Sequence, residues 1–325
     1  MATETRPAFP LAFRISPHMD RARQHNLEWI RAYSLAADYP LPAEDLSQAM
    51  ASIAAYTYPY ALGADLELIA DAMCWFQVFD DLFDLPHQLG RQPHRADRFC
   101  RDMLDVLHYG PPTPSSALPS ALADLWQRIQ RDMSGRWRAR ALHHWDRYLS
   151  AYPHEAIGRR TGVVPDGDAY AQVRRGSGAM DLVMDLIERV RHIEIPASVL
   201  HSPVVHALRE ITALVPDSAN DAHSLPKEEA NGDVYNLVLV TQSERNCSRQ
   251  EAEDAVWRSV NEALRRFADL QPGIDELATN LELNAAECAA LGHYIEGMAL
   301  FMSGEYEWEL GVGRYGMRLP DSASN

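Results

Sequence analysis

Three aspartates stand at the end of an apolar stretch, where their spacing suits metal binding. Asp80, Asp81 and Asp84 follow the apolar residues 72–79. On an α-helix they span about 100° of the circumference and therefore share one face. Their mutual repulsion and the negative end of the helix dipole both disfavour this arrangement, and a bound cation would relieve it. Mg²⁺ prefers such hard oxygen ligands. When this motif is taken alone, the alternative to a metal site is an acidic helix end exposed to solvent.

A second set of oxygen ligands occurs far along the chain. Asn220, Ser224 and Glu228 are spaced four residues apart, which places an amide, a hydroxyl and a carboxylate on one stripe of a helix. All three groups suit Mg²⁺. Lys227, the only lysine among 30 basic residues, lies beside the stripe. A polar helix-capping segment is the alternative reading of this motif when it is taken alone.

Two prolines interrupt the second motif. Pro216 precedes it, and Pro226 lies inside it. A proline within a helix removes a hydrogen bond and costs about 3 kcal/mol where it is not accommodated. We therefore expect the helix to restart near residue 217, with Pro226 inside it and the ligand geometry at Glu228 perturbed.

The elements that must position these residues are helices. Apolar residues recur at helical spacing along most of the chain, and alternating strand patterns are absent. The run 236–240 is interpreted as a buried helix face. We expect one all-α domain over residues 1–315, larger than a four-helix bundle, and a frayed tail over 316–325. The predicted helices cover residues 18–37, 43–57, 64–84, 94–108, 119–133, 137–152, 168–191, 197–215, 218–243, 248–270 and 284–308.

Composition excludes several classes of protein. With 30 basic and 46 acidic residues among 325, the formal net charge is −16, which argues against a nucleic-acid or anionic-membrane surface. The four cysteines are widely spaced without a CxxC pair, so a disulfide scaffold or a zinc site is not expected. The sequence contains no apolar stretch long enough for a membrane span and no secretion signal. We therefore expect a cytoplasmic protein.

Taken in order, the motifs resemble those of the bacterial class I terpene synthases. The sequences DDLFD at 80–84 and NDAHSLPKE at 220–228 are similar to the two metal motifs of that family. Arg174 resembles the family's diphosphate-sensing arginine, and its spacing from the second motif favours it over the neighbouring Arg175. The following Ser177 and Gly178 resemble the family's helix break, although the family often has aspartate where Ser177 stands.

The resemblance extends to the C-terminal part of the chain and implies a set of functional residues. It implies an all-α bundle of ten or more helices around a central apolar cavity, a prenyl diphosphate substrate and three Mg²⁺ ions. The implied metal ligands are Asp80, Asp81, Asp84, Asn220, Ser224 and Glu228. The implied diphosphate contacts are Arg174, Lys227 and the Arg-Tyr pair Arg314 and Tyr315. The implied catalytic groups are Arg174 with Ser177 and Gly178 at the helix break, and the aromatic residues Phe76, Phe79 and Trp308, whose π faces would stabilise cations.

The function expected from this resemblance is that of a sesquiterpene cyclase acting on farnesyl diphosphate. The main alternative is a diterpene cyclase acting on geranylgeranyl diphosphate. A chain-elongating prenyltransferase is less favoured, because those enzymes carry two aspartate-rich motifs. A helical binding protein without catalysis is also less favoured, because every metal-ligand position holds a competent residue. The sequence leaves open the product skeleton, water capture against deprotonation, and the oligomeric state, including a homodimer.

Overall fold

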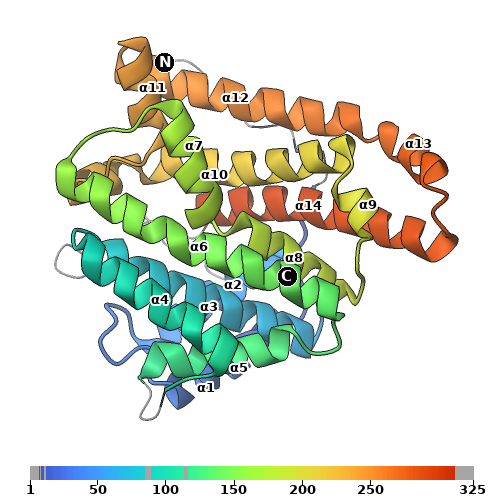
Figure 1. The fold of residues 1–325 in the computed structure, drawn as a ribbon, viewed down its shortest axis with the longest axis horizontal. Coiled ribbons are helices and arrows are strands. Elements are labelled where there is room, and N and C mark those ends of the chain that lie inside the picture. Colours follow the sequence, from blue (N-terminus) through green and yellow to red (C-terminus); the bar gives the residue numbers. More distant parts are fainter. Residues whose placement is uncertain (1–6, 8, 11, 85–88, 113–115, 312–325) are drawn as a thin grey trace, which may run out of the picture.

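The computed structural model describes residues 7, 9, 10, 12–84, 89–112 and 116–311. Over these residues the chain forms fourteen α-helices and no strand, which confirms the all-α prediction (Figure 1). In chain order they are α1 (Met19–Ala32), α2 (Ala43–Thr57), α3 (Ala64–Asp84), α4 (Pro93–Tyr109), α5 (Ala117–Ile129), α6 (Gly135–Thr161), α7 (Gly167–Ser177), α8 (Met180–Arg191), α9 (Ala197–Leu200), α10 (Pro203–Asn231), α11 (Leu237–Arg245), α12 (Arg249–Leu270), α13 (Gly273–Asn280) and α14 (Ala285–Gly311).

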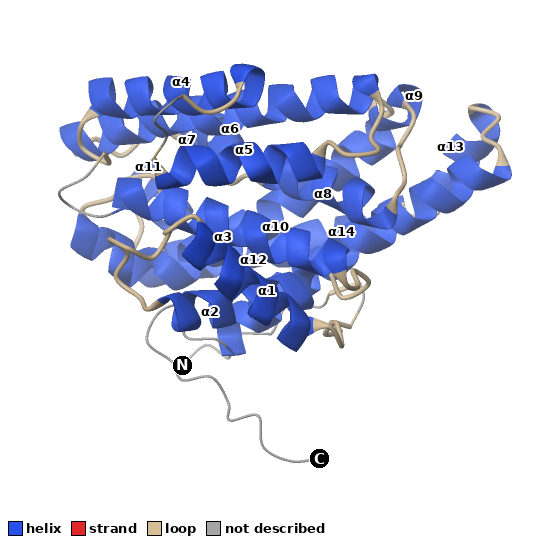
Figure 2. Cartoon of the chain, turned by 90° about the horizontal axis from the view of Figure 1, so that it is seen from below, coloured by secondary structure: helices blue, strands red, loops and turns tan. Residues whose placement is uncertain are grey.

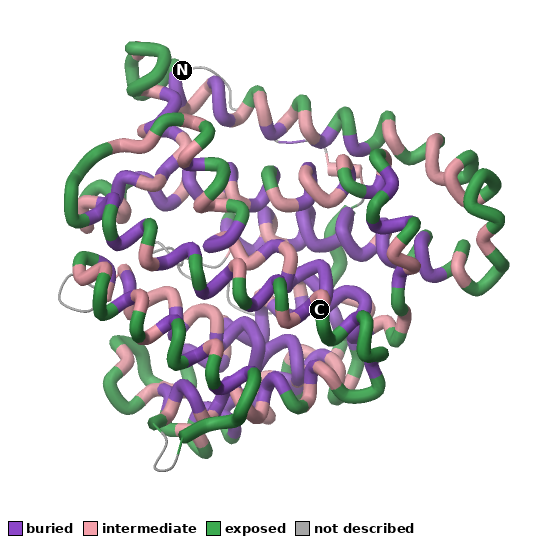
Figure 3. Tube along the Cα trace, in the orientation of Figure 1, coloured by how far each residue is buried: buried purple, intermediate pink, exposed green. Residues whose placement is uncertain are grey.

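The long helices stack in layers around a shared apolar interior (Figure 2). Helix α3 packs against α1, α2, α5 and α8, while α14 packs against α2, α8 and α10. Helix α6 packs against α4, α7 and α8. The buried faces of these helices point inward and the exposed faces lie on the periphery (Figure 3). Burial of apolar side chains along these faces is the main source of stability for the bundle.

Local signals set several of the helix ends. The side chain of Ser134 accepts a hydrogen bond from Trp137 N at 3.2 Å and caps the start of α6. Helix α12 begins with a capping box between Ser248 and Glu251. Gly232 ends α10 with a φ of 70°, a left-handed conformation that glycine adopts without strain. These are interactions within a few residues of one another, so the sequence can specify them.

The structure corrects the prediction for the second motif. Helix α10 continues from Pro203 to Asn231 through both Pro216 and Pro226, so the expected restart near residue 217 is wrong. Packing of α10 against α12 and α14 outweighs the local cost of the prolines. The predicted helix over 218–243 is also wrong, because the chain breaks at Gly232 and α11 starts after Asn236. The side chain of Asn236 caps α11 by accepting from Val238 N.

Smaller differences occur elsewhere. The predicted helix over 168–191 divides into α7 and α8, and α1 ends at Ala32 rather than at residue 37. Helix α6 passes through Pro153 and ends nine residues beyond its predicted end. Helix α13 was not predicted. None of the described helices is long and apolar enough to cross a membrane. Arg314, Tyr315 and the predicted tail over 316–325 lie outside the described residues.

The contact between α14 and α2 gives a first testable prediction. A Cβ atom added to Gly304 would lie 2.1 Å from Tyr56 O, so Gly304→Ala is expected to lower the free energy of unfolding by about 1–3 kcal/mol. Gly292 in the same helix has no atom within 4 Å of such a Cβ. Gly292→Ala should therefore stabilise the protein by about 0.5–1 kcal/mol. Urea unfolding of both variants measures the difference, and equal effects would contradict the close packing.

Candidate active site

The aspartates of the first motif converge at the C-terminal end of α3. One carboxylate oxygen from each of Asp80, Asp81 and Asp84 lies within 4.8 Å of the others. Asp80 accepts a hydrogen bond of 3.0 Å from the hydroxyl of Tyr152 on α6. Asp81 instead accepts a hydrogen bond of 2.8 Å from Gln77, one turn earlier in its own helix. Neutral donors therefore orient the carboxylates of Asp80 and Asp81.

Two cations connect Asp84 to the rest of the site. Arg159 Nη2 and Lys227 Nζ each lie 3.2 Å from an oxygen of Asp84. Arg159 Nη2 also lies 2.6 Å from Asp233 and 3.4 Å from Glu155. Burial raises the pKa of Glu155 to about 7, although Arg159 acts to lower it. Lys227, which the resemblance implied as a diphosphate contact, thus lies between the two motifs.

The second motif lines one side of α10, as its spacing predicted. Ser224 Oγ donates a hydrogen bond to Glu228 Oε1, and Asn236 Nδ2 donates one of 2.8 Å to Glu228 Oε2. Burial, together with the charge of Asp221, raises the pKa of Glu228 to about 8. The hydroxyl and the carboxylate are therefore adjacent despite the proline between them.

Both motifs line one small cavity of about 50 Å³. Its carboxylates outnumber its cations, and two of those carboxyl groups have pKa values raised by burial. This excess of carboxylates with hard-donor oxygens fits a divalent metal ion, because the ion would balance the excess negative charge. Its charged lining residues are Asp80, Asp84, Glu155, Arg159, Arg174, Lys227, Glu228 and Asp233, and Asn220 and Ser224 complete the set of motif residues.

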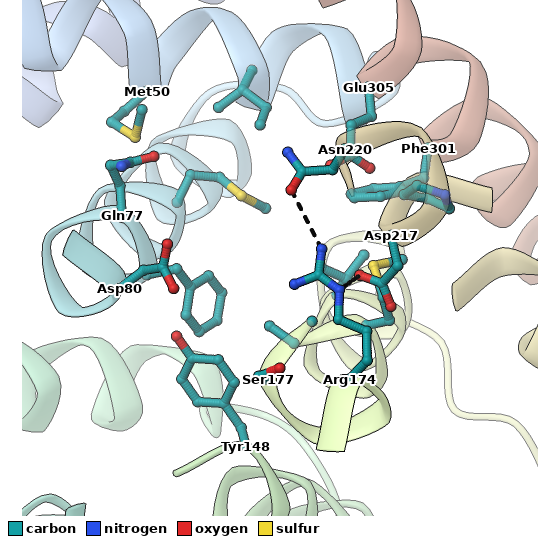
Figure 4. A pocket seen from close by; sticks show the side chains of 18 of the residues that line it. Met50, Gln77, Asp80, Tyr148, Arg174, Ser177, Asp217, Asn220, Phe301 and Glu305 are labelled. Atoms are coloured by element: carbon teal, nitrogen blue, oxygen red, sulfur yellow. Dashed lines mark hydrogen bonds and ion pairs between the residues drawn. The ribbon is translucent and has the colours of Figure 1, made fainter. Parts of the chain in front are cut away.

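Arg174 points into the site, and its neighbour Arg175 does not. Arg174 Nη2 donates a hydrogen bond of 3.3 Å to Asn220 Oδ1 (Figure 4). The amide of Asn220 is oriented from its other end, where Nδ2 donates to Glu309 at 2.9 Å. Arg175 is half exposed and pairs with Glu210. The structure thus places the arginine chosen on spacing, Arg174, against the second motif.

The predicted helix break follows Arg174. Helix α7 ends at Ser177, and Gly178 follows it as the C-cap. Ala179 then adopts a φ of 58°, and α8 begins at Met180. Ser177, Gly178 and Ala179 all line the larger cavity described next, so the break places backbone at the wall of the site.

A larger cavity of about 160 Å³ adjoins the polar site and shares four residues with it. Asp80 and Tyr148 lie on one side of this cavity, and Arg174, Asp217 and Asn220 lie on the other (Figure 4). Side chains from α2, α3, α8 and α14 form the apolar walls. These are Met50, Ile53, Met73, Phe76, Met180, Val183 and Phe301. The arrangement joins a charged end to an apolar chamber.

Of the three implied pocket aromatics, only Phe76 lines this cavity. Phe79 is fully buried and stacks on Trp75, with ring centroids 4.9 Å apart. It lies three positions after Phe76, which turns it about 60° around the helix and into the core. Trp308 is also buried, and its Nε1 donates a hydrogen bond of 2.8 Å to Ser52, tying α14 to α2. The placement of Phe79 and Trp308 at the cavity wall was therefore wrong.

Sequence reasoning missed several residues of the site. Phe301 lines the cavity opposite Asp80, and Tyr148 and Tyr152 approach it from α6. Arg159, on the same helix, reaches Asp84. Tyr148, Tyr152 and Arg159 lie on one face of α6, at positions i, i+4 and i+11. This spacing could have indicated from the sequence that they face the same site. The pattern was missed because the predicted helix ended at residue 152 and so did not include Arg159.

An all-α bundle with a charged, metal-competent end and an apolar chamber defines a class I terpene synthase. Residues 71–266 match the family model described as terpene synthase family 2, C-terminal metal binding. The chain belongs to this family. The match contains both metal motifs and Arg174.

Known proteins similar to the chain support the same class. Pentalenene synthase of Streptomyces avermitilis is 33% identical, with 97% of this chain and 94% of that protein covered. A 7-epi-α-eudesmol synthase of Streptomyces viridochromogenes, named as cyclising (2E,6E)-farnesyl diphosphate, is 30% identical over 97% of this chain and 93% of that protein. The crystal structure of germacradien-4-ol synthase from Streptomyces citricolor superposes with a TM-score of 0.85 at 34% identity, covering 95% of this chain and 99% of that one.

Proposed function

We propose that the protein is a Mg²⁺-dependent sesquiterpene cyclase that ionises farnesyl diphosphate. The observation that carries this proposal is that residues of both motifs and Arg174 lie at one end of a cavity that is also lined by apolar side chains. The names of relatives that cyclise farnesyl diphosphate support the choice of substrate.

The oxygen ligands on α3 and α10 fit a divalent metal ion, and we infer from the family resemblance that three Mg²⁺ ions would bind between them. Asp80 and Asp84 would bind on one side, with Asp81 orienting them, and the second motif (Asn220, Ser224 and Glu228) would bind on the other. Bound there, the ions supply Lewis-acid neutralisation of the diphosphate charge. Arg159 on α6 and Lys227 on α10 already provide positive charge beside Asp84, so the anionic group of the substrate would meet cations from these two helices.

The charged side chains of the protein direct the first step. Arg174 and Lys227 would donate charge-assisted hydrogen bonds to the diphosphate, and arginine can do so through two parallel bonds. The bond between C1 of the substrate and the diphosphate oxygen then breaks, and the electron pair leaves with diphosphate. An allylic cation remains in the apolar part of the cavity.

The apolar wall controls what this cation becomes. Phe76 and Phe301 present aromatic rings at the cavity, where their π faces would stabilise positive charge. The same walls exclude bulk water and fold the chain so that a distant double bond lies near the cation. The electron pair of that double bond forms the new ring bond, and the positive charge moves to the other carbon of that double bond. Loss of a proton from a neighbouring carbon to the released diphosphate, or addition of water followed by loss of a proton, then gives the neutral product.

The position of Phe76 gives a prediction for the product. Phe76→Leu is expected to change the product mixture, because it removes an aromatic ring from the cavity wall while leaving the metal ligands in place. Phe79→Leu, a matched control three residues away in the core, should lower the free energy of unfolding by about 1–3 kcal/mol and leave the mixture nearly unchanged. Gas chromatography with mass spectrometry compares the products. A product profile of Phe76→Leu identical to that of the wild type would show that Phe76 only packs in the core.

Separate incubations with the C10, C15 and C20 prenyl diphosphates test the proposed substrate. With Mg²⁺ present, we expect a cyclic C15 product from farnesyl diphosphate at the highest kcat/KM of the three. Preferred turnover of geranylgeranyl diphosphate would support the diterpene alternative. The mass of the C15 product, with or without one added water, would distinguish water capture from deprotonation.

A further inference from the structure

Asp217 is a largely buried carboxylate of the cavity wall that the metal motifs do not include. It lies on α10, three residues before Asn220, and therefore close to the same face of the helix. Its side chain is 13% exposed and lines the cavity together with Arg174 and Gly178. A buried carboxylate requires a charged partner or several hydrogen bonds, and this position offers one nearby cation.

That cation is Arg174. Arg174 Nε lies 3.6 Å from Asp217 Oδ1, while Arg174 Nη2 lies 2.9 Å from Asp221 Oδ1. Asp221 has further structural partners, since it accepts hydrogen bonds of 2.6 Å from the hydroxyl of Tyr170 and from Leu237 N. Among the ion pairs of the described residues, Asp217 pairs with Arg174 alone. The guanidinium is therefore held between two carboxylates of α10, and its Nη2 also donates a hydrogen bond to Asn220 (Figure 4).

Asp217 also abuts the break between α7 and α8. A Cβ atom placed on Gly178 would lie 2.4 Å from Asp217 Oδ1 and 2.7 Å from Oδ2. The carboxylate thus fills the space that a side chain at position 178 would need. Ser177, next to it, is uncharged, so the link between the two helices supplies no carboxylate of its own for Arg174.

We propose that Asp217 is a positioning residue that holds Arg174 towards the diphosphate site and connects its guanidinium to the backbone at Gly178. This role rests on the proposed function of Arg174 in binding diphosphate. In this proposal, Asp217 acts on the arginine rather than on a metal, although α10 also carries the proposed metal ligands. The binding of diphosphate by Arg174 would then be transmitted to the α7–α8 break through the side chain of Asp217.

Asp217→Asn tests this proposal because it keeps the shape of the side chain and removes its charge. We expect kcat/KM for farnesyl diphosphate to fall roughly 10- to 100-fold, in line with losses measured for residues that orient a directly binding group. Calorimetric titration of the whole protein with inorganic diphosphate and Mg²⁺ should show a Kd weakened by a similar factor. Glu210→Gln is the matched control, because Glu210 lies on the same helix as Asp217 but pairs with Arg175. This substitution should leave kcat/KM and the Kd unchanged.

A double-mutant comparison separates positioning from general structural damage. If Asp217 acts through Arg174, the protein with both Asp217→Asn and Arg174→Gln should bind diphosphate no more weakly than Arg174→Gln alone. Additive losses, or a lowered Tm with an unchanged Kd, would overturn the proposal. Diphosphate binding is measured without turnover. An inactive wild-type protein would therefore contradict the proposed function, while the Kd comparison would still decide the role of Asp217.

Discussion

Replacing Glu228 or Asn220 with alanine is expected to abolish turnover without unfolding the protein. Each change removes an oxygen ligand from the site between α3 and α10, where charge on the leaving diphosphate must be neutralised. If one ligand supports about 4 kcal/mol of transition-state stabilisation, kcat/KM falls about a thousandfold. Steady-state release of diphosphate measures this loss. Circular dichroism should show an intact helical fold, because the burial that raises the pKa of Glu228 is itself unfavourable to the folded state.

Glu229→Ala is the matched control for Glu228→Ala. Glu229 is the next residue of α10, but its carboxylate pairs with Arg249 at the surface. A surface ion pair of this kind contributes at most about 1 kcal/mol to stability, so turnover should remain near that of the wild type. Activity retained by Asn220→Ala or Glu228→Ala would exclude the second motif from the metal site.

Arg174→Lys is expected to lower kcat/KM by about a hundredfold or more. Lysine keeps the positive charge but loses the planar guanidinium that contacts Asn220 and two carboxylates at once. Removing one oriented donor to developing negative charge commonly costs about 10²–10³ in rate. The loss should appear in kcat as well as in KM, because the interaction strengthens as diphosphate departs.

Arg175→Lys provides the comparison within the same turn of helix. Arg175 is half exposed and faces Glu210, away from the cavity. Its substitution should change kcat/KM by less than about twofold, as expected for a surface pair. Equal losses at the two positions would show that Arg174 acts through the general charge of α7 rather than through its contact with the site.

The metal site could be predicted from the sequence because its residues follow helical periodicity. Asp80 and Asp84 lie within two turns of each other, and Asn220, Ser224 and Glu228 repeat every four residues, so one helix fixes each set. In the structure, residues of both sets line one cavity. The choice of Arg174 over Arg175 came from resemblance to a family, since two adjacent arginines are chemically alike.

Other features depend on contacts that no local pattern records. The continuous course of α10 through Pro216 depends on its packing against α12 and α14. Phe76 and Phe79 share a helix and a residue type, and only the direction of the neighbouring helices decides which of them reaches the cavity. Arg159 and Asp217 were overlooked for the same reason, because their partners lie 75 and 43 residues away in sequence. Long-range packing thus determines which of these residues belong to the site, and sequence spacing alone does not show it.

We propose that α3 and α10 together form a metal-dependent site for ionising a prenyl diphosphate. The most direct test is the release of inorganic diphosphate by the purified wild-type protein, with Mg²⁺ or with an excess of chelator. Release from farnesyl diphosphate should require Mg²⁺ and should stop when the chelator is added. If the protein with Mg²⁺ released no diphosphate from the C10, C15 or C20 substrate, or released it equally with chelator, the account would be contradicted.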